Sequence, residues 1–417
     1  MKQSRILSLL LAMILVLAAC SQGGTETKKE DETIGEVTED TTIVFWHAMN
    51  GAQEEALKAM TDAFMEANKN ITVDLQNQTG YQELQQKLTA TTTSPENLPT
   101  LTQAYPDWMF NPIQDGLVHD LTKFTESIDS YDDILDGFKE GTKIDGKVYS
   151  MPFNKSTEVL FYNEEALKEL GKEVPKNLDE LVEVSKAYKE KTGNAALGFD
   201  SLSNYYTTFL NAENAVFDDK FDPTSEASKK AVNYYLDGVK EGYFRIAGSD
   251  KYMSGPFGNE QVLMYIGSNA GESYVKQGAE GKFTPKAAKS PFPATIQQGT
   301  DIFVFESAKD NQKAAAYKYL EWITNAENQA QWGVNTGYIP VSKSAIESDL
   351  YQNSDSIIAP ILSEATEKLY SNPVLRGAND AYREAGTVLE SILADPNSAD
   401  VDSVLNNFKT TLEGIWN

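Results

Sequence analysis

The sequence predicts an α/β fold in which two lobes face each other across a cleft. Segments rich in β-branched and aromatic residues alternate with segments whose apolar residues recur at helical spacing, and this alternation occurs twice along the chain. Helical spacing dominates the remainder from Asn311. With 417 residues, of which 41% are hydrophobic, the chain has enough apolar material for two or more packed cores.

The first α/β pattern begins with a β-branched and aromatic strand over residues 42–46. The segments that follow predict a helix, a strand, a helix and a strand in turn, over residues 53–68, 71–75, 81–91 and 99–105. This order favours a parallel sheet, whose ligands lie outside the carboxyl ends of the strands. We therefore expect functional side chains at those ends and in the turns beside them.

The second α/β pattern follows Pro152. It predicts strands and helices in alternation, over residues 159–162, 178–192, 195–199, 224–243 and 262–266. A further strand is predicted over residues 301–306. Two such patterns that end in a helical tail indicate two lobes.

The first 19 residues have the pattern of a signal peptide. Lys2 and Arg5 precede an apolar run over residues 6–19, which is too short for a transmembrane helix. The letters LAAC followed by Ser21 resemble a bacterial lipobox, which implies cleavage before Cys20 and acylation of its thiol and new amino group. The alternative is an incidental thiol. Residues 20–40 then form a lipidated cysteine and a flexible acidic tether, because they carry too few apolar side chains to fold.

Charge and composition exclude several classes of function. The net charge of −26 opposes nucleic acid as a partner. One cysteine and two histidines cannot make a zinc cluster, and we expect neither a metal nor a cofactor. No nucleophile elbow, phosphate loop or dinucleotide motif is present, so we expect no enzyme. A surface glycoside or phosphodiester hydrolase is the alternative from another class of function, because paired acids such as Glu54 and Glu55 could act in hydrolysis. A solvent-exposed face of a helix or loop explains these acids better.

Aromatic residues near the expected strand ends are the first candidates for a binding site. Aromatic rings with polar edges bind hydroxylated ligands by covering their C–H faces. For each ring the alternative is ordinary core packing. The candidates are Trp46, Tyr81, Tyr105, Trp108, Tyr205, Tyr206 and Tyr338.

Arginine is rare in this lysine-rich chain. After Cys20 it occurs at positions 245, 376 and 383 alone. Arginine binds carboxylate or phosphate with two parallel hydrogen bonds, which lysine cannot do. Arg383 is therefore a candidate for phosphate recognition, and the alternative is a structural ion pair with Asp380 or Glu384.

Three motifs resemble the solute-binding proteins of bacterial ABC importers, in the family that takes up sugars and glycerol phosphates. FWHAMNG from Phe45 is similar to the family's first strand and loop, MPFNKST from Met151 to its first crossing between lobes, and TGYIP from Thr336 to its late tyrosine loop. The resemblance implies a two-lobed fold of the periplasmic-binding-protein type with a hinge. It also implies a monomer on the outer face of the cell membrane that closes on its solute and passes it to a permease.

The resemblance also implies a set of ligand-binding residues, which are Tyr81, Ser156, Ser268, Gly299, Tyr338 and Arg383. Where the family has a glycerol-binding glutamate this chain has Pro106. Asp107, one position later, is the candidate ligand-binding residue that replaces the glutamate if the loop is shifted. Lys155 replaces a small polar residue. The implied ligand is glycerol 3-phosphate or a glycerophosphodiester. A neutral sugar or oligosaccharide is the alternative.

The same resemblance implies that each lobe is built from two separate stretches of chain. The N-terminal lobe is expected to comprise residues 41–150 and about 300–345. The C-terminal lobe is expected to comprise about 151–299 and 346–417.

Overall fold

The computed structural model describes residues 35–416, and the chain divides into two units, Met1–Glu36 and Val37–Asn417. The expected signal peptide, Cys20 and the tether up to residue 34 lie outside the described residues. The helices and strands that the structure describes belong to the second unit.

Nine strands of the described residues form one mixed sheet, in the order β2-β1-β3-β10-β6-β8-β7, with β11 beside β10 and β9 beside β6. β1 (Thr41–His47) pairs in parallel with β2 (Ile71–Asn77) and with β3 (Leu101–Ala104). α2 (Gly51–Ala67) connects β1 to β2, and α3 (Tyr81–Thr91) precedes β3. The parallel β-α-β-α-β arrangement predicted for the first part of the chain is confirmed.

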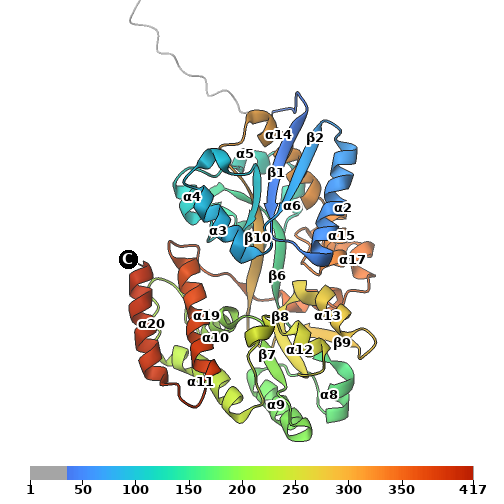
Figure 1. Cartoon of the computed structure of the whole chain (residues 1–417). Coiled ribbons are helices and arrows are strands. Elements are labelled where there is room, and N and C mark those ends of the chain that lie inside the picture. Colours follow the sequence, from blue (N-terminus) through green and yellow to red (C-terminus); the bar gives the residue numbers. More distant parts are fainter. Residues whose placement is uncertain (1–34, 417) are drawn as a thin grey trace, which may run out of the picture. The chain divides into compact units, whose positions relative to one another are not determined.

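Short elements follow in the chain before and after β3, and helices that return late in the chain complete this side of the structure. The short elements are η1 (Pro95–Asn97), α4 (Phe110–Gln114), α5 (Thr122–Thr125), α6 (Asp129–Asp133), α7 (Asp136–Glu140), β4 (Lys143–Ile144) and β5 (Lys147–Val148). The late helices are α14 (Asp310–Thr324), α15 (Ala326–Thr336), α16 (Lys343–Glu347) and α17 (Asp349–Gln352). α14 packs against β1 and α15 against α2, so segments far apart in sequence lie side by side (Figure 1).

Two long antiparallel strands, β6 (Ser150–Asn163) and β10 (Thr295–Val304), run from one lobe into the other (Figure 1). Residues 301–304 of β10 pair with β3, whereas residues 158–163 of β6 pair with β8 and β9. The sequence predicted strands only over 159–162 and 301–306. The remaining part of β6 is buried on both faces and mixes apolar residues such as Phe153 with polar ones such as Asn154 and Lys155, so it lacks the alternation typical of a half-buried strand.

The second lobe surrounds the other half of β6. Its strands are β7 (Leu197–Phe199), β8 (Met264–Ser268), β9 (Pro285–Lys289) and β11 (Leu369–Tyr370). Its helices before β10 are α8 (Glu164–Leu170), α9 (Leu178–Thr192), α10 (Leu202–Ala212), α11 (Glu226–Glu241), η2 (Gly248–Asp250), α12 (Ser254–Gly258), η3 (Asn269–Gly271) and α13 (Glu272–Ala279). Those after β10 are η4 (Ala359–Ile361), α18 (Leu362–Ala365), α19 (Ala378–Ala394) and α20 (Val401–Trp416).

Several groups of buried apolar side chains pack against the sheet, and the group that contains Ile43 extends as far as Tyr265 on β8. One group includes Ile43, Phe64 and Trp332, and a second includes Leu181 and Leu389, all of which are buried. No helix within residues 35–416 is both long and apolar enough to span a membrane.

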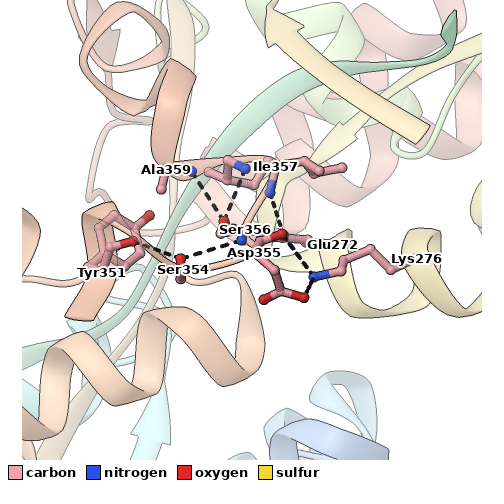
Figure 2. A network of polar contacts seen from close by, with 9 residues as sticks. Glu272, Lys276, Tyr351, Ser354, Asp355, Ser356, Ile357 and Ala359 are labelled. Carbon is pink, nitrogen blue, oxygen red and sulfur yellow. Dashed lines mark hydrogen bonds and ion pairs between the residues drawn. The ribbon is translucent and has the colours of Figure 1, made fainter. Parts of the chain in front are cut away.

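A polar network fixes another connection between the lobes, over residues 353–358 (Figure 2). This segment joins α17, which packs against α15, to η4, which packs against β9. The buried carboxylate of Glu272 on α13 accepts hydrogen bonds from Ser356 Oγ at 2.8 Å and from the backbone N–H of Ile357 at 2.7 Å. Lys276 forms an ion pair with Asp355 at 2.7 Å. The segment is therefore held to α13 at several points.

Candidate functional site

A cavity of about 530 Å³ lies where the two lobes meet. One side is formed by α3 and by the turn that follows β3, and the opposite side by α19 and the loops near Ser201 and Tyr252. The floor is formed by residues 296–299 of β10 and by Lys155 of β6. This position corresponds to the carboxyl ends of the parallel strands β1 and β3, as the sheet order predicts.

The wall on the first lobe is aromatic. The ring of Tyr105 lies 5.5 Å from that of Tyr81 and 5.0 Å from that of Trp108, measured between centroids. The hydroxyl of Tyr81 is 3.0 Å from the hydroxyl of Tyr338, which lies behind it. Packing among the rings holds their orientation and leaves part of each exposed to the cavity.

Asp107 is the acidic residue on this wall. Burial raises the pKa of its carboxyl to about 6, and the nearby carboxylate of Asp380 on α19 acts in the same direction. Hydrogen bonds from the backbone at Asp107 and Trp108 act in the opposite direction. The side chain is therefore a carboxyl group that changes its charge near neutral pH.

The floor contains a buried ion pair between the two crossing strands. Lys155 Nζ lies 2.5 Å from Asp301 Oδ1, and Ser150 Oγ donates a hydrogen bond of 2.8 Å to Asp301 Oδ2. Burial raises the pKa of Asp301, whereas the Lys155 ammonium acts to lower it. The ammonium group is thus held by a partner inside the protein, which reduces its availability to a ligand.

Gly299 is the position on the floor where only glycine fits. Its φ is +112°, and a Cβ there would lie 1.7 Å from the backbone oxygen of Asn154 on the paired strand. The strand pair changes register next to it, between Thr300 and Asp301. Glycine therefore permits the close approach of the two crossing strands beneath the cavity.

The wall on the second lobe is polar and is carried largely by α19. Asn379, Tyr382 and Arg383 line the cavity from this helix. The Tyr382 hydroxyl donates to Asn204 Oδ1, and Asn204 Nδ2 donates to Glu158 Oε1 at 2.9 Å. Burial raises the pKa of Glu158 to about 8. A chain of hydrogen bonds thus connects this wall to a carboxyl on β6.

Two hydrogen bonds cross the cavity between the lobes. Trp108 Nε1 donates to Asn379 Oδ1 at 3.0 Å, and Arg383 Nη1 donates to Gln85 Oε1 at 3.1 Å. Arg383 is exposed at the rim, so its guanidinium is hydrated rather than buried in the cleft. Its partner is a glutamine and not the acid at 380 or 384 that the sequence offered as an alternative.

The cavity brings together several of the side chains proposed from the sequence. These are Tyr81, Tyr105, Asp107, Trp108, Gly299 and Arg383. The remaining ones do not line it. Tyr338 lies behind Tyr81, Ser156 is buried on β6, and Ser268 caps η3 by accepting from the backbone N–H of Ala270 at 3.2 Å.

Trp46 is also turned away from the cavity. Its indole donates to Gln76 Oε1 at 2.9 Å, and the Lys87 ammonium lies 3.9 Å from its ring centroid. Its ring packs in a group with Leu84 and Leu88, on the side of the sheet that α3 covers. The ring therefore has a structural role here.

The placement of Tyr205 and Tyr206 at a strand end was wrong. Both lie within α10 and are fully buried. Tyr205 donates to the backbone oxygen of Ala231 at 2.6 Å, and the Tyr206 hydroxyl is 2.6 Å from Ser228 Oγ on α11. The core alternative applies to them, because the Tyr205 ring packs against Phe199 and Tyr235. The Tyr206 ring packs against Phe217 and Phe408.

Several cavity residues were not singled out from the sequence. Asn379 and Tyr382 precede Arg383 by four residues and one residue on α19, so a helical reading of that segment would have placed Asn379 on the same face. Tyr252 follows Lys251, whose φ is +63°, in an irregular loop. The sequence contains no signal for its position.

Within the described residues, no three histidine, cysteine or acidic side chains are grouped so as to hold a metal ion.

Comparisons with known proteins agree with this architecture. Residues 59–359 match the family model described as bacterial extracellular solute-binding protein. The sn-glycerol-3-phosphate-binding periplasmic protein UgpB of Escherichia coli K12 is 25% identical over 372 residues, which cover 80% of this chain and 82% of the relative.

Solved structures show the same two-lobed fold. The GacH receptor of Streptomyces glaucescens, solved unliganded and with acarbose, has a TM-score of 0.79 at 21% identity and covers 90% of this chain and 98% of its own. UgpB from Mycobacterium tuberculosis in complex with glycerophosphocholine has the same TM-score, identity and coverage. The match over residues 59–359 spans most of the chain, and the protein belongs to the bacterial extracellular solute-binding protein family.

Proposed function

We propose that this solute-binding component of an ABC importer captures glycerol 3-phosphate or a glycerophosphodiester in the cavity between α3 and α19. The observation that carries the proposal is the pair of opposed walls, aromatic on one lobe and hydrogen-bonding on the other, with Arg383 at the rim. The hydroxyl and amide groups of α19 suit glycerol hydroxyls, and the guanidinium suits a phosphate. The names of relatives that bind glycerol 3-phosphate and glycerophosphocholine support this ligand class.

A neutral sugar or oligosaccharide is the second candidate. It is favoured by the aromatic surface of Tyr81, Tyr105 and Trp108, which suits the C–H faces of a sugar. It is also favoured by the ion pair between Lys155 and Asp301, because this cation is then less available to a phosphate. A structural neighbour solved with acarbose is consistent with such a ligand.

Lobe closure is the proposed mechanism of capture. A ligand that contacts both walls stabilises the closed arrangement, because those contacts exist only when the walls face each other. The closed form then delivers the solute to the permease. The hydrogen bonds from Trp108 to Asn379 and from Arg383 to Gln85 already bridge the same two walls.

We also propose that the protein acts as a monomer held to the outer face of the membrane by acylation of Cys20. Cys20→Ser is then expected to release the protein from membranes or to leave it unprocessed, as seen by fractionation and mass spectrometry. A membrane-bound, lipid-modified mutant would contradict the anchor.

Calorimetry with Arg383→Ala tests the ligand. If Arg383 binds the phosphate, the loss of charge-assisted hydrogen bonds weakens glycerol 3-phosphate binding by about 1.5–3 kcal/mol, or roughly ten- to a hundredfold. Arg376→Ala is the matched control, because Arg376 is exposed in the same segment and does not line the cavity. Wild-type protein that binds maltose but neither glycerol 3-phosphate nor its diesters would establish the sugar alternative instead.

A further inference from the structure

The charged side chains around the cavity differ in the groups that they contact. The cation on the floor, Lys155, is held by Asp301 at 2.5 Å, and the guanidinium at the rim donates to Gln85. Asp107 is different, because the charged group that acts on it is a second carboxylate, Asp380. The wall near Asp107 therefore carries negative charge when this carboxyl is ionised. The net charge of −26 adds to the attraction for a cation.

Aromatic rings approach the same region from both lobes. Tyr105 and Trp108 flank Asp107 in the turn that follows β3. Tyr252 lines the cavity from the second lobe with 64% of its surface exposed, although large apolar side chains in this protein are seldom so exposed. The face of an aromatic ring carries partial negative charge and attracts a cation within about 6 Å.

We propose that Asp107 forms, with Tyr105 and Tyr252, a subsite for an ammonium group carried by a hydroxylated solute. The inference rests on the proposed function, because it assumes that this cavity is the solute site. A carboxylate balances the charge of an ammonium, and ring faces bind its C–H surface without displacing tightly held water. The ammonium could belong to a choline-type ester of glycerol phosphate or to an amino sugar. In the first case the phosphate lies away from Asp107, toward Arg383.

The charge of Asp107 makes this subsite dependent on pH. The charged groups that share the cavity with it are Lys155 on the floor and Arg383 on α19, and Asp380 lies nearby on the same helix. The tyrosines that share the cavity are Tyr81, Tyr105, Tyr252 and Tyr382. Burial raises the pKa of all four tyrosines, so they stay neutral below pH 8. Burial also raises the pKa of Asp107 to about 6, and a bound cation favours its charged form. Affinity for the cation therefore increases as the pH is raised from 5 to 8.

The test compares two pairs of ligands, in each of which one member carries an ammonium group and the other is neutral at that position. The probes are glycerophosphocholine and its isostere in which a tert-butyl group replaces the trimethylammonium, together with glucosamine and glucose, measured by calorimetry on the full chain. At pH 7 we expect the charged member of the preferred pair to bind at least tenfold more tightly than the neutral one. Asp107→Asn is expected to bring the pair to within about threefold, with binding of the neutral member retained. Asp115→Asn, at an exposed acid outside the cavity, is expected to change neither.

The outcomes separate this inference from the proposed function. Equal binding of glycerophosphocholine and its isostere would overturn the ammonium subsite and leave the glycerophosphodiester assignment intact. Equal loss of both ligands in Asp107→Asn would also overturn it, because the residue would then act without regard to charge. Preference for glucosamine over glucose, with no binding of either diester, would support the subsite and overturn the glycerol phosphate assignment. Binding of none of the four would overturn both.

Discussion

Glu158 is a buried carboxyl on β6 that connects to the cavity wall through Asn204 and Tyr382. Burial is the main reason that its pKa is raised to about 8, and the nearby charge of Asp200 adds to the shift. In the unfolded chain the carboxyl has an ordinary pKa, near 4.5. The folded protein therefore holds a proton that the unfolded chain releases over this interval of pH.

The first prediction is that stability falls as the pH rises toward 8. Because the folded pKa is raised, the stabilising contribution of the proton is complete below about pH 4.5 and is lost as the pH passes through about 8. The free energy of unfolding should decrease by on the order of 1 kcal/mol per pH unit over this range. Glu158→Gln, which keeps an oxygen for Asn204, should remove most of this dependence.

Urea unfolding at pH 5, 7 and 8.5 measures the effect. Glu55→Gln is the control, since Glu55 is exposed on α2. Asp200→Asn provides a second comparison, because burial raises the pKa of Asp200 to about 7 and adds a smaller dependence of the same sign. Parallel stability curves for the wild type and Glu158→Gln would contradict the assignment.

At the scale of elements, the pair of crossing strands decides where the cavity lies. β6 and β10 approach each other closely at Gly299, and the register changes beside it. The pairing of the two backbones therefore determines which residues line the floor of the cavity. Lys155, which the sequence marked only as a departure from the family pattern, becomes part of a buried ion pair through this strand pairing.

The second prediction is that Gly299→Ala destabilises the protein strongly. A Cβ at this position would collide with the backbone of Asn154, and backbone atoms cannot move aside without breaking the strand pair. The expected cost is about 3 kcal/mol or more. Thermal or urea unfolding measures it.

Gly281→Ala is the matched control for this prediction. Gly281 also has a positive φ, of +70°, but nothing lies within 4 Å of its expected Cβ. Its substitution should cost about 1 kcal/mol, from backbone conformation alone. Equal stability of the two variants would contradict the predicted collision between a Cβ at position 299 and the backbone of β6.

At the scale of the whole molecule, function depends on how the lobes move about their connections. Besides β6 and β10, the segment over residues 353–358 joins them and is fixed by Glu272 (Figure 2). Hinge motion must therefore be absorbed near these three segments of the described chain. The expected sequence boundaries of the lobes stay a prediction.

The third prediction is that saturating ligand makes the protein more compact. Closure brings the two walls of the cavity together, so the radius of gyration measured by small-angle scattering should decrease. A solute that does not bind by calorimetry serves as the control for changes in the solvent. Binding confirmed by calorimetry without any change in scattering would contradict capture by closure.

The sequence by itself determined the α/β class, the order of the first strands and helices, and the likeness to solute-binding proteins. These follow from local patterns: α3 and α9 begin and end where their apolar spacing predicts.

Tertiary structure decided which aromatic residues reach the cavity. Tyr105 and Tyr205 look alike in sequence, but one lies in a turn at the sheet edge and the other is enclosed between α10 and α11. It also decided that Lys155 faces Asp301, and that Asn379, Tyr382 and Tyr252 line the cavity, because these positions depend on strand pairing and on the approach of segments far apart in sequence.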